Sequence, residues 1–276
     1  MVKPALSQAQ APLVAESLAI DAQGRTQVVH IPEERPLTVY VNRREMVTLM
    51  TLGANPEWLV LGWLRNQRLA EHLDEVHSIQ VDWDVASAAV VADEAVLARW
   101  ETASQQRLVT TGCGQGAHHG PLLQDQTPLA LPPATLTQSA LIDLIAQVRG
   151  LQTLYKQAGS VHGCGLFCGD RLLLWLEDVG RHNAVDAISG WMWLNDRDGH
   201  DLVFYTTGRL TSEMVVKAAL MGIPYLLSRS GVTRMGLEMA RQVHMTLISR
   251  CVGEHFLIHH GQERVTFDPQ PALETP

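Results

Sequence analysis

Residues 177–186 hold the side chains best suited to chemistry. They lie where an apolar run, predicted to be a strand, gives way to a predicted helix at 184–194 with Asn183 as its N-cap. Ligands of open α/β sheets bind at this end of a strand. Arg181 and His182 can bind an anion there, and the neighbouring acids can hold them in place or accept a hydrogen bond from a base. The simpler alternative is an ordinary capped turn with a salt bridge.

Two further turns, 207–213 and 229–234, also join a predicted strand to a predicted helix, and each holds an arginine. Free backbone N–H groups and the helix dipole attract anions at such a point, and arginine suits phosphate. Lys217 lies one helical turn beyond Glu213, on the same face. The alternative is a capped helix with a surface ion pair. Three such turns in one sheet favour a phosphate-bearing ligand lying across the strand ends.

No Gly-x-Gly-x-x-Gly or Walker-type loop is present. The usual binding modes of dinucleotides and ATP are therefore not predicted.

Cys113 is the candidate nucleophile. It lies in a glycine-rich segment, expected to be a mobile loop, close to His118 and His119. A nearby imidazolium lowers the pKa of a thiol, and a thiolate can attack sulfur and carry it as a persulfide. The alternative is a small residue in a flexible loop.

His162, Cys164 and Cys168 have the ligand types of a zinc site. On a strand, however, they project at wide spacing from one face, and no second Cys-x-x-Cys pair exists. Buried free thiols are the simpler interpretation, and no structural zinc is expected.

The composition limits the classes of partner. The chain has 276 residues, 46% of them apolar, and a formal net charge of −8, which argues against binding to nucleic acid or acidic membranes. No window approaches the ~20 apolar residues of a membrane span, and the start does not read as a signal peptide. We therefore expect a cytoplasmic protein with reduced cysteines.

The apolar periodicity predicts five regions along the chain. They are a disordered N-terminus at 1–13, a mixed α+β part at 14–111, a cysteine-bearing loop and linker at 112–134, an α/β domain at 135–268, and a tail at 269–276. The first part is predicted to have strands at 14–20, 26–31, 37–41, 46–50, 76–81 and 85–91, and a helix at 56–66 capped by Asn55. The α/β domain is predicted to begin with a long helix at 136–157. Strands are then predicted at 161–167, 171–176, 202–206, 225–227, 245–251, 255–260 and 264–267, and the last of them is predicted to close the sheet. Helices are predicted at 184–194, 212–221 and 233–243.

The unbroken stretch 177–186 resembles the signature of the formate dehydrogenase accessory protein family, the FdhD-like sulfurtransferases. The resemblance covers about residues 16–267. Further matching residues are Gly208, Arg209, Ser212 to Val215, Lys217, Gly222 to Pro224, Gly159, His162, Thr246 to Ile248, Pro36 to Asn42 and Glu57 to Leu64.

This resemblance implies that the protein receives persulfide sulfur from a cysteine desulfurase. It would pass that sulfur to a molybdenum bis(molybdopterin guanine dinucleotide) cofactor, which is then inserted into the catalytic subunit of formate dehydrogenase. It also implies a homodimer and a cytidine-deaminase-like C-terminal domain without zinc, a mixed sheet with helices on both faces. GDP or GMP would mimic the cofactor's nucleotide ends.

The predicted site follows from the polar turns and from this resemblance. Cys113 aligns with the persulfide position. The cofactor-binding residues are predicted to be Glu177, Asp178, Arg181, His182, Asn183, Asp186, Gly208, Arg209, Ser212, Glu213, Lys217, Ser230, Thr233, Arg250, Cys251, Val252, Gly253, Glu254 and His255. Among them, the residues predicted to bind the phosphates are Arg181, His182, Arg209, Ser212 and Lys217. The residues predicted to shape the site or to recognise guanine are Asp178, Asn183 and Asp186. The contacts of residues 250–255 are implied by the family resemblance.

The chain departs from the family pattern at the cysteine loop, where the usual Cys-Gly-x-Cys ends in Gly116 instead of a second cysteine. Two hypotheses follow: a sulfurtransferase that uses Cys113 alone, or a cofactor-binding chaperone without sulfur chemistry. A zinc hydrolase of the deaminase type is the third hypothesis, but the His-x-Glu and Pro-Cys-x-x-Cys motifs that it needs are absent.

Overall fold

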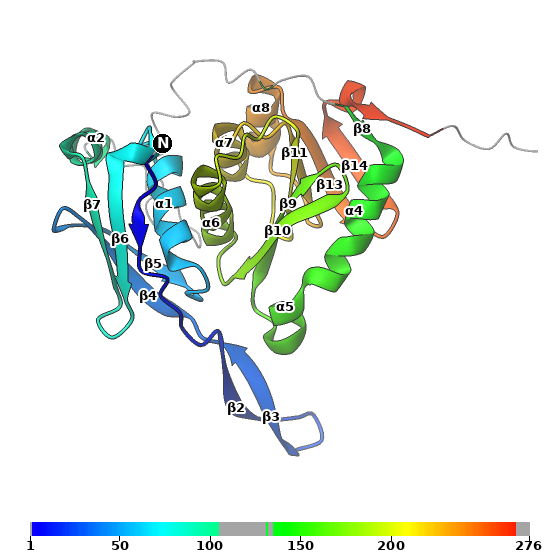
Figure 1. Cartoon of the computed structure of the whole chain (residues 1–276). Helices are drawn as coiled ribbons and strands as arrows, with labels where there is room; N and C mark the ends of the chain where they lie inside the picture. Colours follow the sequence, from blue (N-terminus) through cyan, green and yellow to red (C-terminus); the bar gives the residue numbers. More distant parts are fainter. Residues whose placement is uncertain (1, 105–130, 132–134, 269–276) are drawn as a thin grey trace, which may run out of the picture.

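The computed structural model describes residues 2–104, 131 and 135–268, and its two principal sheets have five and six strands (Figure 1). The first sheet has the strand order β1-β6-β7-β4-β5. Its strands are β1 (Ala5–Leu6), β4 (Arg35–Val41), β5 (Arg44–Thr51), β6 (Val76–Asp82) and β7 (Ser87–Ala92). Helix α1 (Pro56–Asn66) follows β5, a single 3-10 turn (Leu73–Glu75) precedes β6, and α2 (Glu94–Ser104) follows β7. These strands and α1 confirm the elements predicted for this part of the chain.

Strands β2 (Val14–Ile20) and β3 (Thr26–Pro32) form a separate antiparallel hairpin. Figure 1 shows this hairpin projecting away from both principal sheets. The predicted pair of strands is therefore correct, and its turn lies at residues 21–25.

The start of the chain differs from the prediction of a disordered segment at 1–13. Strand β1 pairs in parallel with β6, and the carboxylate of Glu57 on α1 accepts hydrogen bonds from Ser7 Oγ at 2.5 Å and from Ala9 N at 2.7 Å. The Gln- and Pro-rich composition suggested disorder, but a sheet edge and a buried acid supply backbone partners that composition does not reveal.

The second sheet has the order β10-β9-β11-β12-β13-β14. Its strands are β9 (His162–Cys168), β10 (Arg171–Asp178), β11 (Leu202–Thr206), β12 (Tyr225–Ser228), β13 (Thr246–Val252) and β14 (His255–His260). The three strands β11, β12 and β13 are parallel, whereas β9 runs antiparallel to β11 and β14 antiparallel to β13. The sheet is therefore mixed, as the predicted fold class requires.

Helices cover both faces of this sheet. One face packs against α6 (Arg181–Leu194), α7 (Ser212–Leu220) and α8 (Arg234–Gln242), and the other against α4 (Gln138–Leu151). Each face has its own apolar core, centred on residues such as Phe204 and Val215 on the first face and Phe167 and Tyr205 on the second. The chain is thus an α/β protein. The likeness of this domain to the cytidine-deaminase fold stays a prediction.

Two elements near this sheet differ from the sequence expectations. The long helix predicted at 136–157 is divided into α4 and α5 (Thr153–Ala158), which are separated by Gln152, and Leu136–Thr137 instead forms the short strand β8. The last predicted strand does not close the sheet, because β15 (Val265–Thr266) pairs with β8 in a two-stranded unit of its own. The apolar periodicity of 136–157 runs through the break, so the pattern alone could not locate it.

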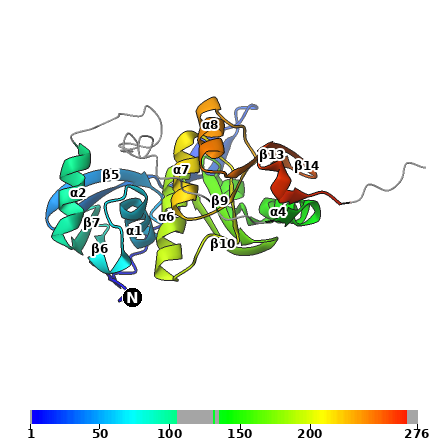
Figure 2. The same ribbon diagram turned by 90° about the horizontal axis from the view of Figure 1, so that it is seen from above.

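Helices α1 and α6 join the two halves of the structure, and they lie side by side in both views (Figures 1 and 2). A Cβ atom added to Gly62 would lie 1.7 Å from the carbonyl oxygen of Asp186, and one added to Gly190 would lie 2.0 Å from that of Trp58. These two glycines therefore permit the helices to approach with their backbones in contact. The first residues of α6, which belong to the polar turn 177–186, are held in place by this packing.

Candidate functional site

The three polar turns meet at one edge of the second sheet. His162 at the start of β9 pairs with Asp178 at the end of β10, and Cys164 of β9 pairs with Thr206 at the end of β11. Thr206 in turn pairs with Ser228 at the end of β12. The turns that follow Asp178, Thr206 and Ser228 therefore lie next to one another, as the alternation of strands and helices predicted.

Hydrogen bonds tie the second turn to the third. The backbone N–H of Leu210 donates to the Gly231 carbonyl at 2.9 Å, and that of Thr233 donates to the Leu210 carbonyl at 3.0 Å. Ser228 Oγ donates to the Gly208 carbonyl at 2.5 Å. Because these bonds fix the two backbones relative to each other, the side chains of both turns share one surface.

Arginines from all three turns occupy this edge. Arg181 lies against the α-carbon of Gly208, where an added Cβ atom would come within 2.4 Å of Arg181 Cδ. The guanidinium of Arg229 lies 5.6 Å from the ring centre of Tyr155 and donates to Gln152 Oε1 at 3.3 Å. Arg209 is exposed. Within the described chain, neither Arg209 nor Arg229 forms an ion pair with a carboxylate, so this edge has uncompensated positive charge.

His162 lies among these arginines. Its imidazole is half-buried, and Nδ1 lies 3.3 Å from Thr207 Oγ1, which also accepts a hydrogen bond from Gly163 N at 3.0 Å. Burial lowers the pKa of His162, and the positive charges of Arg181, Arg229 and Arg209 lower it further. Thr207 is followed by Gly208, against which Arg181 packs, so the imidazole and the Arg181 side chain lie at the same part of this edge.

The prediction from sequence missed His162 as a residue of this edge. The sequence analysis named it as a possible zinc ligand, because it lies near two cysteines in a strand, and as a residue of the family match, but assigned it no contact with the ligand. Its place beside the three turns depends on the pairing register of β9 with β10 and β11, which sequence patterns do not specify.

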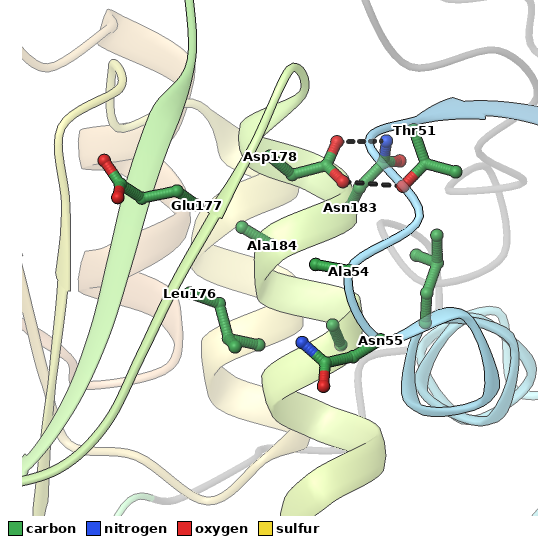
Figure 3. A pocket seen from close by; sticks show the side chains of 10 residues that line it. Thr51, Ala54, Asn55, Leu176, Glu177, Asp178, Asn183 and Ala184 are labelled. Atoms are coloured by element: carbon green, nitrogen blue, oxygen red, sulfur yellow. Dashed lines mark hydrogen bonds between the residues drawn. The ribbon is translucent and has the colours of Figure 1, made fainter. Parts of the chain in front are cut away.

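Asp178, predicted to shape the ligand site, has a structural role here. Its carboxylate accepts hydrogen bonds from Thr51 Oγ1 at 2.6 Å and from Asn183 Nδ2 at 2.8 Å, as well as from the N–H groups of Leu52 and Gly180, both at 3.1 Å. Figure 3 shows the two hydrogen bonds that join this carboxylate to Thr51 and Asn183. Although these four bonds stabilise the charged form, burial raises the pKa of Asp178.

Asn183 and Glu177 also hold the framework. Helix α6 begins at Arg181 with Gly180 in the N-cap position, so the prediction of Asn183 as the cap is wrong; Asn183 Nδ2 instead donates to the Met50 carbonyl at 2.6 Å. Glu177 points to the opposite side of β10 from Asp178 (Figure 3) and accepts from the N–H groups at the start of α5, at 2.9 Å and 3.2 Å. Both side chains thus connect neighbouring elements.

A small cavity lies beside Asp178 and Asn183, between the start of α1 and helix α6 (Figure 3). Its volume is about 10 Å³, near the lower limit for a single water molecule. It cannot hold a nucleotide, so the exposed edge with the arginines is the better place for a ligand.

A row of charged side chains runs from the edge into the interior. His182 Nδ1 lies 3.3 Å from Glu213 Oε1, Lys217 Nζ lies 3.6 Å from the same oxygen, and Lys217 Nζ lies 2.8 Å from Asp186 Oδ2. Asn66 Nδ2 donates to Asp186 Oδ1 at 2.7 Å. Burial opposes the charge of Lys217, but the two carboxylates outweigh it and raise its pKa.

Lys217 was predicted to bind phosphate, and Asp186 to shape the site or read guanine. The Lys217 side chain is only 2% exposed and the Asp186 side chain 3%. Their contacts therefore place both in the interior framework and away from the exposed arginines.

The remaining hydroxyl residues lie at helix starts. Thr233 Oγ1 accepts from Gly236 N at 3.1 Å and so caps α8, whereas Ser212 is the first residue of α7, which has Thr211 in the N-cap position. Ser230 N donates to Ser228 Oγ at 2.8 Å, within the third turn. Ser212 and Ser230 are partly exposed and remain open to a ligand.

Residues 250–255 lie at the same edge, because β13 is parallel to β12 and ends beside it. The N–H of Arg250 donates to the Ser230 carbonyl at 3.0 Å, which connects this segment to the third turn. Cys251 is buried in the core, and burial raises its pKa to about 12. The exposed members of the segment are Arg250, Val252, Gly253, Glu254 and His255.

Cys113, the predicted persulfide carrier, lies outside the described residues, as do His118 and His119. Of the other cysteines, Cys164 is fully buried and burial raises its pKa to about 12, which favours the thiol over the reactive thiolate. In residues 2–104, 131 and 135–268, no group of three His, Cys, Asp or Glu side chains is placed to hold a metal ion.

Comparisons with known proteins give one consistent result. The family model described as FdhD/NarQ family matches residues 32–266. The chain is 29% identical over 239 residues to a protein of Bacillus pumilus (strain SAFR-032) named sulfur carrier protein FdhD, a match that covers 86% of this chain and 90% of that protein. It is 28% identical to a protein of the same name from Staphylococcus haemolyticus (strain JCSC1435), over 84% of this chain and 88% of that protein.

A solved structure is also similar. It is described as a putative formate dehydrogenase accessory protein from Desulfotalea psychrophila, with a TM-score of 0.75 and 29% sequence identity, covering 92% of this chain and 100% of that chain. None of the helices in the described residues is both long and apolar enough to span a membrane.

Proposed function

The chain belongs to the FdhD/NarQ family, and on that basis we propose that it is a sulfur carrier that acts in the maturation of formate dehydrogenase. The names of its relatives in Bacillus and Staphylococcus and the description of the similar solved structure support this role. The substrate of the proposed reaction is a molybdenum bis(molybdopterin guanine dinucleotide) cofactor, which receives sulfur before it enters the enzyme.

The single observation that carries the cofactor-binding part is the convergence, at one edge of the sheet, of the three turns that hold Arg181, Arg209 and Arg229. Arginines of like charge repel one another, so their convergence without carboxylate partners for Arg209 and Arg229 favours an anionic ligand. A diphosphate that links two nucleoside-like groups supplies such an anion, and a guanidinium can bind its oxygens through two hydrogen bonds.

We propose two roles for the predicted residues, based on their exposure and contacts. The three arginines, with the exposed polar groups of Ser212, Ser230 and the segment 250–255, are proposed to contact the cofactor. The buried side chains of Glu177, Asp178, Asn183, Asp186 and Lys217 hold the turns in position.

The sulfur-carrying step is proposed to use Cys113. The Cys113 thiolate attacks the outer sulfur of a persulfide on a cysteine desulfurase; the desulfurase cysteine leaves as a thiolate, and Cys113 becomes the persulfide. The outer sulfur then passes to the bound cofactor: Cys113 leaves as a thiolate, and a reduced molybdenum centre would supply the two electrons that convert the transferred sulfur to sulfide. The protein is proposed to act in the cytoplasm as a homodimer.

GDP binding tests the cofactor-binding part. We expect GDP, which resembles the nucleotide end of the cofactor, to bind the purified protein, and Arg209→Ala to weaken its affinity about tenfold, as loss of one charge-assisted contact implies. Arg241→Ala is the matched control, because Arg241 is also exposed but lies at the end of α8 opposite the third turn. Equal affinities of the wild type and Arg209→Ala would contradict the proposal.

A cofactor-binding chaperone without sulfur chemistry is the second candidate, and the observation that favours it is Gly116 in place of a second loop cysteine. Cys113→Ala separates the two functions. If this variant supports full formate dehydrogenase activity and still binds GDP, the protein is a chaperone. If activity is lost while GDP binding persists, Cys113 carries the sulfur, and mass spectrometry of the gently purified wild type should show an added sulfur atom.

A further inference from the structure

The arginine cluster leaves His162 in an unusual place for an imidazole. His162 begins β9, the antiparallel strand between β10 and β11, so it lies beside the turns that follow both strands. Its Nδ1 is directed at Thr207 Oγ1, 3.3 Å away, within the second turn. The ring is therefore fixed on the framework, at the centre of the edge where a ligand is proposed to bind.

The charges that face His162 come from several elements. Arg181 comes from α6, Arg209 from the turn after β11, and Arg229 from the turn after β12. On the adjacent strand β10, the Asp178 carboxylate accepts its four hydrogen bonds from Thr51, Leu52, Gly180 and Asn183. On α7, the Glu213 carboxylate lies 3.6 Å from Lys217 Nζ and 3.3 Å from His182 Nδ1. These two acids are thus engaged with other groups, and the charges of the arginines dominate at the imidazole.

We infer that His162 is a ligand-binding residue of this edge, and that its imidazole takes up a proton when a diphosphate enters among the three arginines. The inference rests on the proposed binding of a guanine dinucleotide. It adds a contact that the sequence did not predict and a pH dependence that arginines alone cannot give, because arginine stays charged at every physiological pH.

The direction of the pH effect follows from the charges. Without a ligand, burial and the three arginines lower the pKa of His162, so the ring is neutral near pH 7. A bound diphosphate offsets the arginine charges, which raises the pKa of the imidazole again. Between these two pKa values binding takes up a proton, and the affinity increases as the pH falls. The protonated ring can donate from both nitrogens, one toward Thr207 and the other toward a phosphate oxygen.

The test uses the full-length protein and diguanosine diphosphate. Each phosphate of this probe is esterified to one guanosine and joined to the other phosphate, so neither phosphate titrates near neutral pH. Calorimetric titrations in two buffers of different ionisation enthalpy give the number of protons taken up. We expect proton uptake by the wild type and an affinity that tightens several-fold from pH 8 to pH 6, since a shift of about one pKa unit changes the affinity by at most about tenfold.

His162→Asn removes the titrating ring but keeps a side-chain N–H in reach of Thr207. We expect it to bind the probe more weakly, without proton uptake and with an affinity independent of pH. His200→Asn is the matched control, because His200 is an exposed histidine that precedes β11 at the opposite edge of the sheet. It should behave as the wild type.

The outcomes are distinct. If the wild type binds the probe without proton uptake and with a pH-independent affinity, the inference about His162 is wrong, while the proposed function stands. If the wild type does not bind the probe at all, the proposed function fails and the inference fails with it. The calorimetry of the wild type decides between these results even if His162→Asn does not fold.

Discussion

Lys217 Nζ lies 2.8 Å from Asp186 Oδ2 in the interior of the protein, and both side chains are almost completely buried. The two residues come from neighbouring helices, α7 and α6, so the ion pair connects the second polar turn to the first. A buried charge without its partner is strongly unfavourable. The pair therefore fixes the relative position of α6, which begins at Arg181, and α7, which follows the turn that holds Arg209.

Replacing Lys217 with methionine tests this role. Lys217→Met leaves the carboxylates of Asp186 and Glu213 without their cation, and we expect the free energy of unfolding to fall by about 3–5 kcal/mol. Urea denaturation measures the change. Lys156→Met, on the exposed face of α5, is the control and should change stability by less than about 0.5 kcal/mol.

The same variant distinguishes a framework role from direct phosphate binding. If Lys217→Met unfolds at the wild-type urea concentration but no longer binds GDP, Lys217 contacts the ligand and its assignment to the framework is wrong.

Thr51→Val tests the link between the two halves of the structure. Thr51 Oγ1 donates to the buried Asp178 carboxylate across 127 positions of sequence. Valine removes one donor to the buried carboxylate and leaves the N–H of Gly53 without its acceptor, Thr51 Oγ1. We therefore expect the protein to lose about 1–3 kcal/mol of stability. Chemical denaturation checks this value, with the exposed Thr26→Val as control. A loss no larger than that of the control would argue against the link.

Gly208→Ala tests the position of Arg181. The added methyl group would lie 2.4 Å from Arg181 Cδ, so the arginine must move away from the second turn. We expect the affinity for GDP to fall about tenfold or more, since one bidentate contact is worth about 1.5–3 kcal/mol. Gly231→Ala is a matched control in the third turn, because its nearest neighbour would be Arg250 Nη2 at an ordinary 3.8 Å. Equal affinities in the two variants would show that Arg181 does not bind the ligand.

The stability of the ligand-free protein should also depend on His162. Its pKa is lowered in the folded state, so the unfolded chain binds the proton more readily. Stability is therefore lost as the pH falls from the unfolded value of about 6.5 toward the lower folded value. Urea denaturation at several pH values should show this loss in the wild type and a flatter dependence in His162→Asn. An identical pH dependence in the two proteins would contradict the assignment.

The sequence predicted the sheet and its polar edge well, because both follow from local patterns. Apolar runs located strands β9 to β14, and each strand-to-helix turn held an arginine that the structure places at the shared edge. The roles within the signature could not be predicted in the same way. Whether Asp178 faces a ligand or the interior depends on Thr51, and the role of Asp186 depends on Asn66, 120 positions earlier in the chain. Contacts with residues so far away in the sequence cannot be predicted from the local spacing of residue types.

His162 and the divided helix at Gln152 show the same limit. The histidine became part of the site only through the pairing of β9 with its two neighbours. The helix break falls at Gln152, whereas the nearby Gly150 still lies inside α4 and does not mark it. Conversely, the polar start of the chain looked disordered because its partners, the edge of β6 and the carboxylate of Glu57, lie far along the sequence.

The contact between Gly62 and Gly190 has a consequence for how this protein can change over evolution. Neither half can be exchanged for that of a distant relative unless the new half also has a glycine where α1 and α6 cross. A larger residue at either glycine would clash with the backbone of the helix from the other half. The two halves are therefore expected to be inherited together, as one unit of selection.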